Sequence, residues 1–490
     1  MAYNAKGIQI KNAGAWKRSA PIAVLPTVMV LLSVLMHLFP GVPAFVPIAL
    51  YAATFFSVLA FTIYDYVHKV THDMSYALCC PLSLSIFMNL FLSGIAHEIS
   101  NSIAALLLSS NILYAFVVAA VAACIELSHR GGSQIGNRIV ALLCVLMGYA
   151  VLLYILHPST ITSFASTSRN LITPFCFFLL GAVLAERVTL DSFCDLVIAL
   201  GFLVIAFGFV ECFVFPDFWV KANIHDLWGL KGIKIPVSQP PSNFYSSETI
   251  NGVHMRRMAS LFADPVNLGA FLFCVFMAAW YRRRWFMVVL AVVSCALTVS
   301  KGALLGFLVW IFLYFLITSE NVWVKRAALF SVFAIGIGFL GFSAVSSTGS
   351  VAAHMRGALG GLESIINNPF GYGCGNVGVL ASLANNHAMR GVEESGFGVI
   401  AGEVGIIGVA VYAIFFIVTL RSGLEARDKR VKIMACTLLL AIFANIMFNE
   451  VALSPNSCGV YFSLLGVMLG DSLPHDEPEI RGAHFARSDW

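Results

Sequence analysis

Long apolar runs separated by short clusters of charge are the feature that most restricts this chain. The runs are roughly 18 to 25 residues long, about the length that a helix needs to cross the hydrocarbon of a bilayer. Apolar residues fill 59% of the 490 positions and charged residues only 11%, whereas a soluble domain is typically about 25% charged. Such a chain would aggregate in water. Because backbone groups in lipid must be bonded internally, the runs are predicted to be helices.

About fourteen membrane spans are predicted on this length criterion. They fall at about 20–38, 43–64, 75–95, 103–125, 139–157, 170–185, 192–215, 266–281, 286–300, 303–318, 327–346, 397–420, 433–452 and 460–472. The predicted fold class is therefore all-α, a polytopic helical bundle. It forms a single transmembrane domain over 19–472, between polar tails at 1–18 and 473–490.

The distribution of positive charge predicts the orientation of these spans. If the N-terminus is cytoplasmic and the spans alternate, the cytoplasmic tails and connections together hold most Lys and Arg residues, including Arg282 to Arg284 and the cluster from Arg421 to Lys432. This arrangement satisfies the positive-inside rule. Both tails are then expected in the cytoplasm.

Two long segments, at about 216–265 and 347–395, are expected on the opposite, extracytoplasmic side. These two loops hold or adjoin most of the basic residues on that side: Lys221, Lys231, Lys234, Arg256, Arg257, Arg356 and Arg390. Long loops escape the charge rule, and long ordered loops are usually functional. The pattern favours a membrane enzyme over a transporter. The net charge of +4 forms no basic stripe, so no nucleic-acid partner is predicted.

The end of the first loop carries a candidate phosphate clamp. Asp264 followed by Pro265 predicts a helix N-cap with proline at the first helical position, and Arg256 and Arg257 stand a few residues before it. Arginine binds phosphate through a planar fork, whereas the alternative is a residue that snorkels at the headgroups. The same two interpretations apply to Lys301, at a sharp outer turn.

The second loop begins with Arg356 and apolar residues at 359, 362, 365 and 366. This spacing predicts an amphipathic helix that lies on the membrane or covers a site. The proline and glycine residues of 369–375 are expected to end the helix in a tight turn.

Two adjacent carboxylates, Glu393 and Glu394, stand directly before the next helix, close to His387, Arg390 and Ser395. They could simply complement the helix dipole. In a functional interpretation, Glu394 is a general base that takes a proton from a sugar hydroxyl. His387 is the alternative base, because imidazole titrates near neutral pH.

Four carboxylates fall within or at the ends of spans, where ionisable groups normally face the bundle interior. They are Asp195, Glu211, Glu403 and Glu450. Glu403, between glycines, is interpreted as structural glue for close helix contacts. A proton relay, which would favour a transporter, is not indicated because the four form no evident series.

Three stretches give the chain a resemblance to the O-antigen polymerase and ligase superfamily of bacterial envelope glycan enzymes. The first is 257–269, similar to the family's Arg-Phe-Pro-Asn-Leu pattern, although Asn267 is displaced by one residue. The second is 300–303, where Lys301 replaces the family's usual Arg. The third joins Arg356, the turn at 368–373 and the segment from Glu394 to Gly408.

The resemblance implies a GT-C-like membrane glycosyltransferase of the bacterial cytoplasmic membrane, with its active face outward. It transfers a glycan chain from a polyprenyl-diphosphate donor to a repeat unit on the same kind of lipid, directly and with inversion. Arg257, Lys301 and Arg356 would hold the diphosphate, and Glu394 would activate the acceptor, with Arg256, His387, Arg390, Glu393 and Ser395 as further substrate contacts. No cofactor or metal is expected, because fixed cations can take the metal's place.

Two alternatives remain on sequence grounds. Ligases of the superfamily carry a His-Asn pair where this chain has Glu394-Ser395, which favours a polymerase over an O-antigen ligase. A lipid-linked oligosaccharide flippase would be expected to have short loops and a charged interior. Besides the lipid-linked glycans and membrane lipid, a chain-length regulator and a flippase are the expected protein partners.

Overall fold

The computed structural model describes residues 15–39, 41–129, 134–233, 235–237, 239–250, 253–345, 350–384 and 395–471. Of the two predicted tails, only residues 15–18 are included, and they open the first helix rather than precede it. The described residues are helical apart from one antiparallel hairpin. The all-α prediction therefore holds, with two short strands as the exception.

The elements follow one another along the chain with short connections. The first half comprises α1 (Ala15–Leu38), α2 (Phe45–His68), α3 (Ser75–Ile95), α4 (Asn101–Leu108), α5 (Ser110–His129), α6 (Gln134–Leu156), α7 (Ile161–Leu184) and α8 (Leu190–Phe209), continued by a π-helical turn, η3 (Val210–Val214). The first loop holds α9 (Phe218–Lys221), α10 (Ile224–Leu230), β1 (Tyr245–Ile250) and β2 (Val253–Arg256). Then come α11 (Pro265–Tyr281), α12 (Trp285–Thr298), α13 (Lys301–Thr318), α14 (Val322–Val345), α15 (Ser350–Asn367), α16 (Val379–Ala384), α17 (Gly396–Glu425), α18 (Lys429–Phe448) and α19 (Pro455–Asp471).

The described residues contain eight helices that are long and apolar enough to cross a membrane, or nine if the bent pair α4 and α5 forms one span. The chain is thus a multi-pass helical membrane protein, but the prediction of about fourteen spans is wrong. Each predicted range overlaps a helix. However, α11, α12 and α19 have only 17, 14 and 17 residues, fewer than the roughly 20 that a crossing requires.

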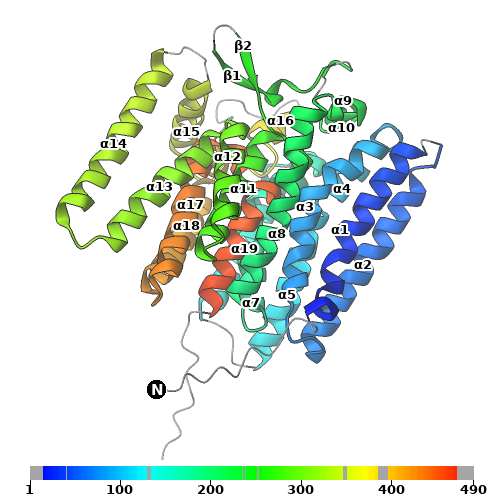
Figure 1. Ribbon diagram of the computed structural model, residues 1–490, viewed down its shortest axis with the longest axis horizontal. Coiled ribbons are helices and arrows are strands. Elements are labelled where there is room, and N and C mark those ends of the chain that lie inside the picture. Colours follow the sequence, from blue (N-terminus) through cyan, green and yellow to red (C-terminus); the bar gives the residue numbers. More distant parts are fainter. Residues whose placement is uncertain are drawn as a thin grey trace, which may run out of the picture.

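Burial separates the centre of the bundle from its rim. The apolar stretches of α3 and α7 are 94% and 83% buried, against 17% for α13, and nearly all of α11 is buried as well. Figure 1 shows α3, α8, α11 and α19 together in the middle, while α13 and α14 lean outward on one side and α1 and α2 stand on the other. The rim helices therefore present their apolar faces to lipid.

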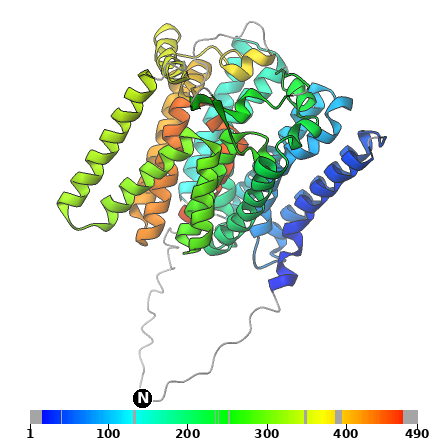
Figure 2. The same cartoon turned by 45° about the horizontal axis from the view of Figure 1, so that its top comes forward.

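Both long loops gather at the same end of the bundle, which we call the loop end. The elements α9, α10 and the β1–β2 hairpin of loop one lie there with α15 and α16 of loop two (Figures 1 and 2). Segments more than a hundred residues apart in the sequence are thus brought together. A site formed by both loops is possible only because they lie at the same end of the bundle.

Glycine contacts hold α7 and α19 together in the centre. A methyl group added at Gly181 would lie 2.4 Å from the carbonyl oxygen of Ser463, and one added at Gly466 would lie 2.2 Å from that of Phe178. Only glycine permits such an approach of two helix backbones, as is common in membrane bundles.

We expect Gly181→Ala to lower the stability of the purified protein in detergent by about 1 to 3 kcal/mol, because the added methyl overpacks a rigid backbone contact. The measurement is the thermal unfolding midpoint. The control is Gly148→Ala in α6, where nothing lies within 4 Å of the new methyl. An equal loss of stability in both variants would contradict this account of the α7–α19 contact.

Candidate functional site

The predicted helix cap at the end of loop one is present and places Arg257. Asp264 caps α11, with its side chain accepting from the Val266 amide, and Pro265 is the first helical residue. The Nε atom of Arg257 donates to the carbonyl of Thr298 at 2.7 Å, and Nη1 donates to the carbonyl of Asn243 at 3.2 Å. Arg257 therefore ties loop one to the end of α12.

This contact brings two of the sequence motifs together. Thr298 ends α12, and Lys301 opens α13 three residues later. Gly302, beside Lys301, lies close to α18, because a methyl group there would lie 2.6 Å from the side-chain amide of Asn445. The glycine thus allows α13 to pack on α18. Arg257 and the turn that carries Lys301 thus form one locus at the loop end.

Arg256 has a different environment from its neighbour. It forms an ion pair with Glu211, the Nη2–Oε1 distance being 2.5 Å. The other oxygen of Glu211 accepts hydrogen bonds from the amides of Ala259 and Ser260. Glu211 is fully buried, so this pair anchors the strand β2 to the end of α8. The geometry favours a structural role for Arg256 over the substrate contact predicted from the sequence.

Loop two contains the predicted amphipathic helix, α15, and the structure shows which residues form its two faces. In α15 the small residues Gly357, Gly361 and Ser364 are buried, and a methyl group on Gly361 would lie 2.8 Å from the Cα of Gly398 in α17. The large residues Leu359, Leu362 and Ile366 are exposed. The outward face is therefore apolar and suited to lipid.

Arg356 lies exposed on the same helix, α15. That helix packs mainly on α17 and also on α18. Arg356 thus belongs to the loop end, as predicted, but on the α17 side of the bundle rather than on the α11–α12 side that carries Arg257.

The glycine turn after α15 docks onto a break in α17. Gly405 has φ 59° and ψ −156°, a conformation that is essentially restricted to glycine. The amides of Tyr372 and Gly373 donate to the carbonyls of Gly402 and Glu403, at 2.8 and 3.0 Å. The helix break thus supplies acceptors for the turn.

Two of the intramembrane carboxylates also hold loop two. An oxygen of Glu403 accepts the Gly375 amide at 2.9 Å, and an oxygen of Glu450 accepts the Val379 amide at 2.9 Å. This agrees with the structural interpretation of Glu403. The remaining carboxylate, Asp195, pairs with Arg282 at the opposite end of the bundle.

Ser395 is the N-cap of α17. Its hydroxyl accepts the Gly398 amide at 3.0 Å and donates to the carbonyl of Met447 at 2.8 Å, which accounts for the residue without a substrate. The other predicted residues of this segment, His387, Arg390, Glu393 and Glu394, lie outside the described residues, so their roles stay predictions.

Sequence reasoning missed a set of polar residues between the helices near the loop end. We call it the polar cluster; it comprises Asn89, Ser109, Asn111, Arg169, Lys231 and Asn456. Lys231 at the end of α10 donates to Asn89 of α3 at 3.1 Å, and Arg169 of α7 donates to Ser109 at 3.4 Å. Asn111, two residues after Ser109, donates to Asn456 at the start of α19.

A signal for Arg169 was available in the sequence. The predicted span began at residue 170 and left Arg169 in the preceding connection, but α7 begins at Ile161 and includes it. An arginine within a transmembrane helix is by itself a pointer to function. Lys231 offered no comparable signal, because its partner is 142 residues away in the sequence.

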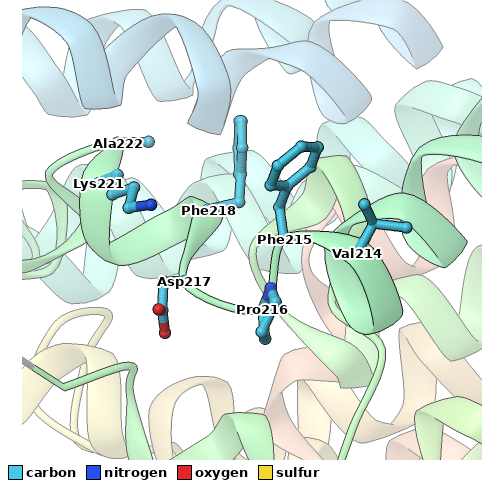
Figure 3. Close-up of a pocket in the computed structure, with 7 residues that line it drawn as sticks. All are labelled: Val214, Phe215, Pro216, Asp217, Phe218, Lys221 and Ala222. Atoms are coloured by element: carbon cyan, nitrogen blue, oxygen red, sulfur yellow. The ribbon is translucent and has the colours of Figure 1, made fainter.

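Two small hollows at the surface lie outside these groups. One, of about 260 Å³, is lined by Phe215, Phe218, Lys221 and their neighbours where α8 passes into α9 (Figure 3). It is smaller than most small-molecule sites, which measure about 300 to 1,000 Å³. Within the described parts of the chain, no three His, Cys, Asp or Glu side chains are grouped to hold a metal ion.

Comparison with known proteins adds no family. No protein-family model matches the chain, and no curated protein is significantly similar to it. The fold and the site geometry therefore carry the functional argument.

We expect Glu211→Gln to destabilise the protein by roughly 3 kcal/mol, because removing one partner leaves the other charge uncompensated beside the bundle. Thermal unfolding and protease cleavage in loop one would report the loss. The matched control is Glu425→Gln, which breaks the exposed Arg421–Glu425 pair and should cost no more than about 0.5 kcal/mol. If Glu211→Gln were as stable as the control, Arg256 would be free to act on substrate.

Proposed function

We propose that this chain is a polymerase of a cell-surface polysaccharide. It would transfer a growing glycan from a polyprenyl-diphosphate donor to a lipid-linked repeat unit at the outer face of the bacterial cytoplasmic membrane. One observation carries the proposal: the hydrogen bond from Arg257 to Thr298 joins loop one to the turn that bears Lys301. Two basic side chains from separate motifs thus share one end of a membrane bundle.

The chemistry at this locus follows from the substrate class. The acceptor hydroxyl attacks the anomeric carbon of the donor sugar, a new carbon–oxygen bond forms, and the bond to the diphosphate breaks. The electron pair leaves with the diphosphate, and the hydroxyl proton passes to a base. Fixed cations at the leaving group stabilise the charge that develops there. A single displacement inverts the anomeric centre.

The residues take distinct roles in this proposal. Lys301 and Arg257 face the leaving diphosphate, and Arg257 also fixes the turn through its backbone contacts. Arg356 approaches from loop two, on α15. Glu394, directly before α17, is the proposed base, and His387 is the alternative. The cap made by Ser395 fixes the start of the helix that follows the base.

Orientation is part of the same proposal. The loop end is taken as extracytoplasmic because the opposite end carries Arg282 to Arg284 and the cluster from Arg421 to Lys432, as the positive-inside rule predicts. Lipid-linked glycans would then reach the locus by diffusion in the outer leaflet. A chain-length regulator and a flippase are the proposed protein partners.

The test uses a host strain that lacks this chain, complemented with wild type, Arg257→Ala, Arg257→Lys, Glu394→Gln or His387→Gln. We expect deletion to shorten the surface glycan from a ladder to single repeat units. Arg257→Ala should not restore the ladder, because it removes a cation and a loop anchor together, while Arg257→Lys should restore it in part. Glu394→Gln should abolish polymer and His387→Gln should not, if Glu394 is the base.

Membrane expression of every variant is measured alongside, and Arg284→Ala, an exposed residue at the opposite end, is the matched control. Full-length polymer that builds up on the lipid carrier would identify a ligase instead. Single units trapped on the cytoplasmic side would identify a flippase. A normal ladder in the deletion strain would refute the proposal.

A further inference from the structure

Two cations of the polar cluster have no carboxylate partner within ion-pair distance. Among the described residues, Arg169 donates only to Asn170 and Ser109, over 3.3 to 3.4 Å, and Lys231 donates to Asn89 at 3.1 Å. All of these acceptors are neutral. A guanidinium with long bonds to neutral oxygens is weakly satisfied, and a charge inside a membrane bundle is costly unless it is paired.

The negative charge described near Lys231 and Arg169 is also too small to balance their positive charge. Lys231 lies in the field of both Arg169 and Asp264, and Asp264 in turn lies near Arg257. Among the described residues, Asp264 is the carboxylate that acts on Lys231, and it also lies near Arg257. Asp264 is further committed to capping α11 and accepting from Asn243 and Asn267. It cannot neutralise Arg169 and Lys231 as well.

The two cations come from different elements, α7 and the end of α10. Arg169 lies eight residues into α7, roughly 12 Å below the start of that helix at the usual rise per residue, and the start of α7 touches loop two through Ser163 and Gly375. Lys231 descends from loop one to α3. Both side chains are partly exposed rather than fully buried.

Amide side chains complete the lining. Asn111 donates to Asn456 at 3.3 Å and to Ser85 at 2.9 Å, and Ser85 stands one turn before Asn89 on α3. Amide and hydroxyl groups of this kind can donate to or accept from the oxygen atoms of a polar ligand. A group of cationic and amide side chains without a paired carboxylate is suited to bind an anion.

We propose that Arg169 and Lys231, with the amides of the polar cluster, form an oxyanion-binding site within the bundle, made of residues other than Arg257 and Lys301. The ligand group is a phosphate or a carboxylate. Its source is either the diphosphate of a lipid-linked substrate or the carboxylate of an acidic sugar in the repeat unit. That the oxyanion belongs to a glycan substrate rests on the proposed function; the binding itself does not.

Arg257 is left out of this site because of how it is held. Two of its nitrogens already donate to backbone carbonyls, so it is a poor candidate for moving toward Arg169. Among the described residues, Lys231 and Arg169 make no such backbone contact. Their side chains can therefore reorient toward a bound anion.

Burial and the nearby Arg169 lower the pKa of Lys231 to about 8, while Asp264 opposes the shift. Lys231 is thus charged at pH 7 and loses its proton as the pH rises through about 8. Anion affinity should fall over this range. Lys231→Arg should remove the fall, because the guanidinium stays protonated throughout.

The experiment measures binding to the purified full-length protein in nanodiscs by titration calorimetry at constant ionic strength. The probes are inorganic pyrophosphate and glucuronate. The variants are Lys231→Met, Arg169→Met and Lys231→Arg, with Lys221→Met as the matched control, because Lys221 is exposed on α9. Thermal unfolding of each variant shows that it is folded.

We expect one of the two probes to bind wild type and Lys221→Met alike, and Lys231→Met and Arg169→Met to weaken it by about tenfold or more, as the loss of a charge-assisted contact predicts. Lys231→Arg should bind at pH 7 and still bind at pH 9. Preference for pyrophosphate assigns the diphosphate as the source, and preference for glucuronate assigns an acidic sugar.

The proposal is overturned if neither probe binds the folded wild type, or if both methionine variants bind as the wild type does. These outcomes are independent of the glycan ladder. If the deletion strain keeps its ladder while the calorimetry shows binding lost in Lys231→Met, the polymerase function fails and the anion site stands.

Discussion

The architecture of the loop end depends on α17, a helix whose regular backbone conformation is broken at Gly405. In hydrocarbon an interrupted ladder is tolerated only where other protein groups take up the freed backbone atoms. At Gly405, the turn after α15 does this: it donates to two carbonyls of α17, and the Ile406 amide donates back to the carbonyl of Pro369 at 2.9 Å. Loop two is thereby part of the bundle and not an appendage to it.

The same turn also fixes the start of α7. The hydroxyls of Ser159 and Ser163 donate to the carbonyls of Cys374 and Gly375, both at 2.8 Å. Because Arg169 follows on α7, its position in the polar cluster is set by contacts made at the docked turn. Loop one is anchored by other means, the Arg256–Glu211 pair and the carbonyl contacts of Arg257. Two loops with independent anchors thus meet around one group of cations.

Local patterns predicted local structure well. The cap at Asp264 and Pro265 is encoded by adjacent residues, and the helix at 359–366 is encoded by its spacing, so both were found. The sequence left open whether this helix lies on the membrane or covers a site; in the structure, glycines face α17 and the large apolar residues face outward. The span count failed where a helix such as α11 is buried among other helices and need not match the bilayer thickness.

Candidate residues could be grouped from the sequence only where a motif held them together. Arg257 and Lys301 were singled out, and Arg257 contacts Thr298, just before the turn that carries Lys301; their function stays a prediction. Arg256 was grouped with them because it is adjacent, yet its side chain is held by Glu211. Lys231 acquires its significance from Asn89, Asp264 and Arg169, which come from three other helices or their caps. Such long-range proximity leaves no trace in spacing or composition.

The outward face of α15 has a consequence for the lipid that surrounds the protein. Leu359, Leu362 and Ile366 are 50 to 81% exposed, and water cannot rest against such a surface without cost. Acyl chains are suited to cover this surface, and Phe213, Val214 and Phe215, before α9, expose apolar surface on the side of loop one as well. Lys221 and Asp217, which follow them, are exposed and require water. A molecule anchored in the leaflet would therefore meet an apolar edge beside either loop before its headgroup meets the charged residues.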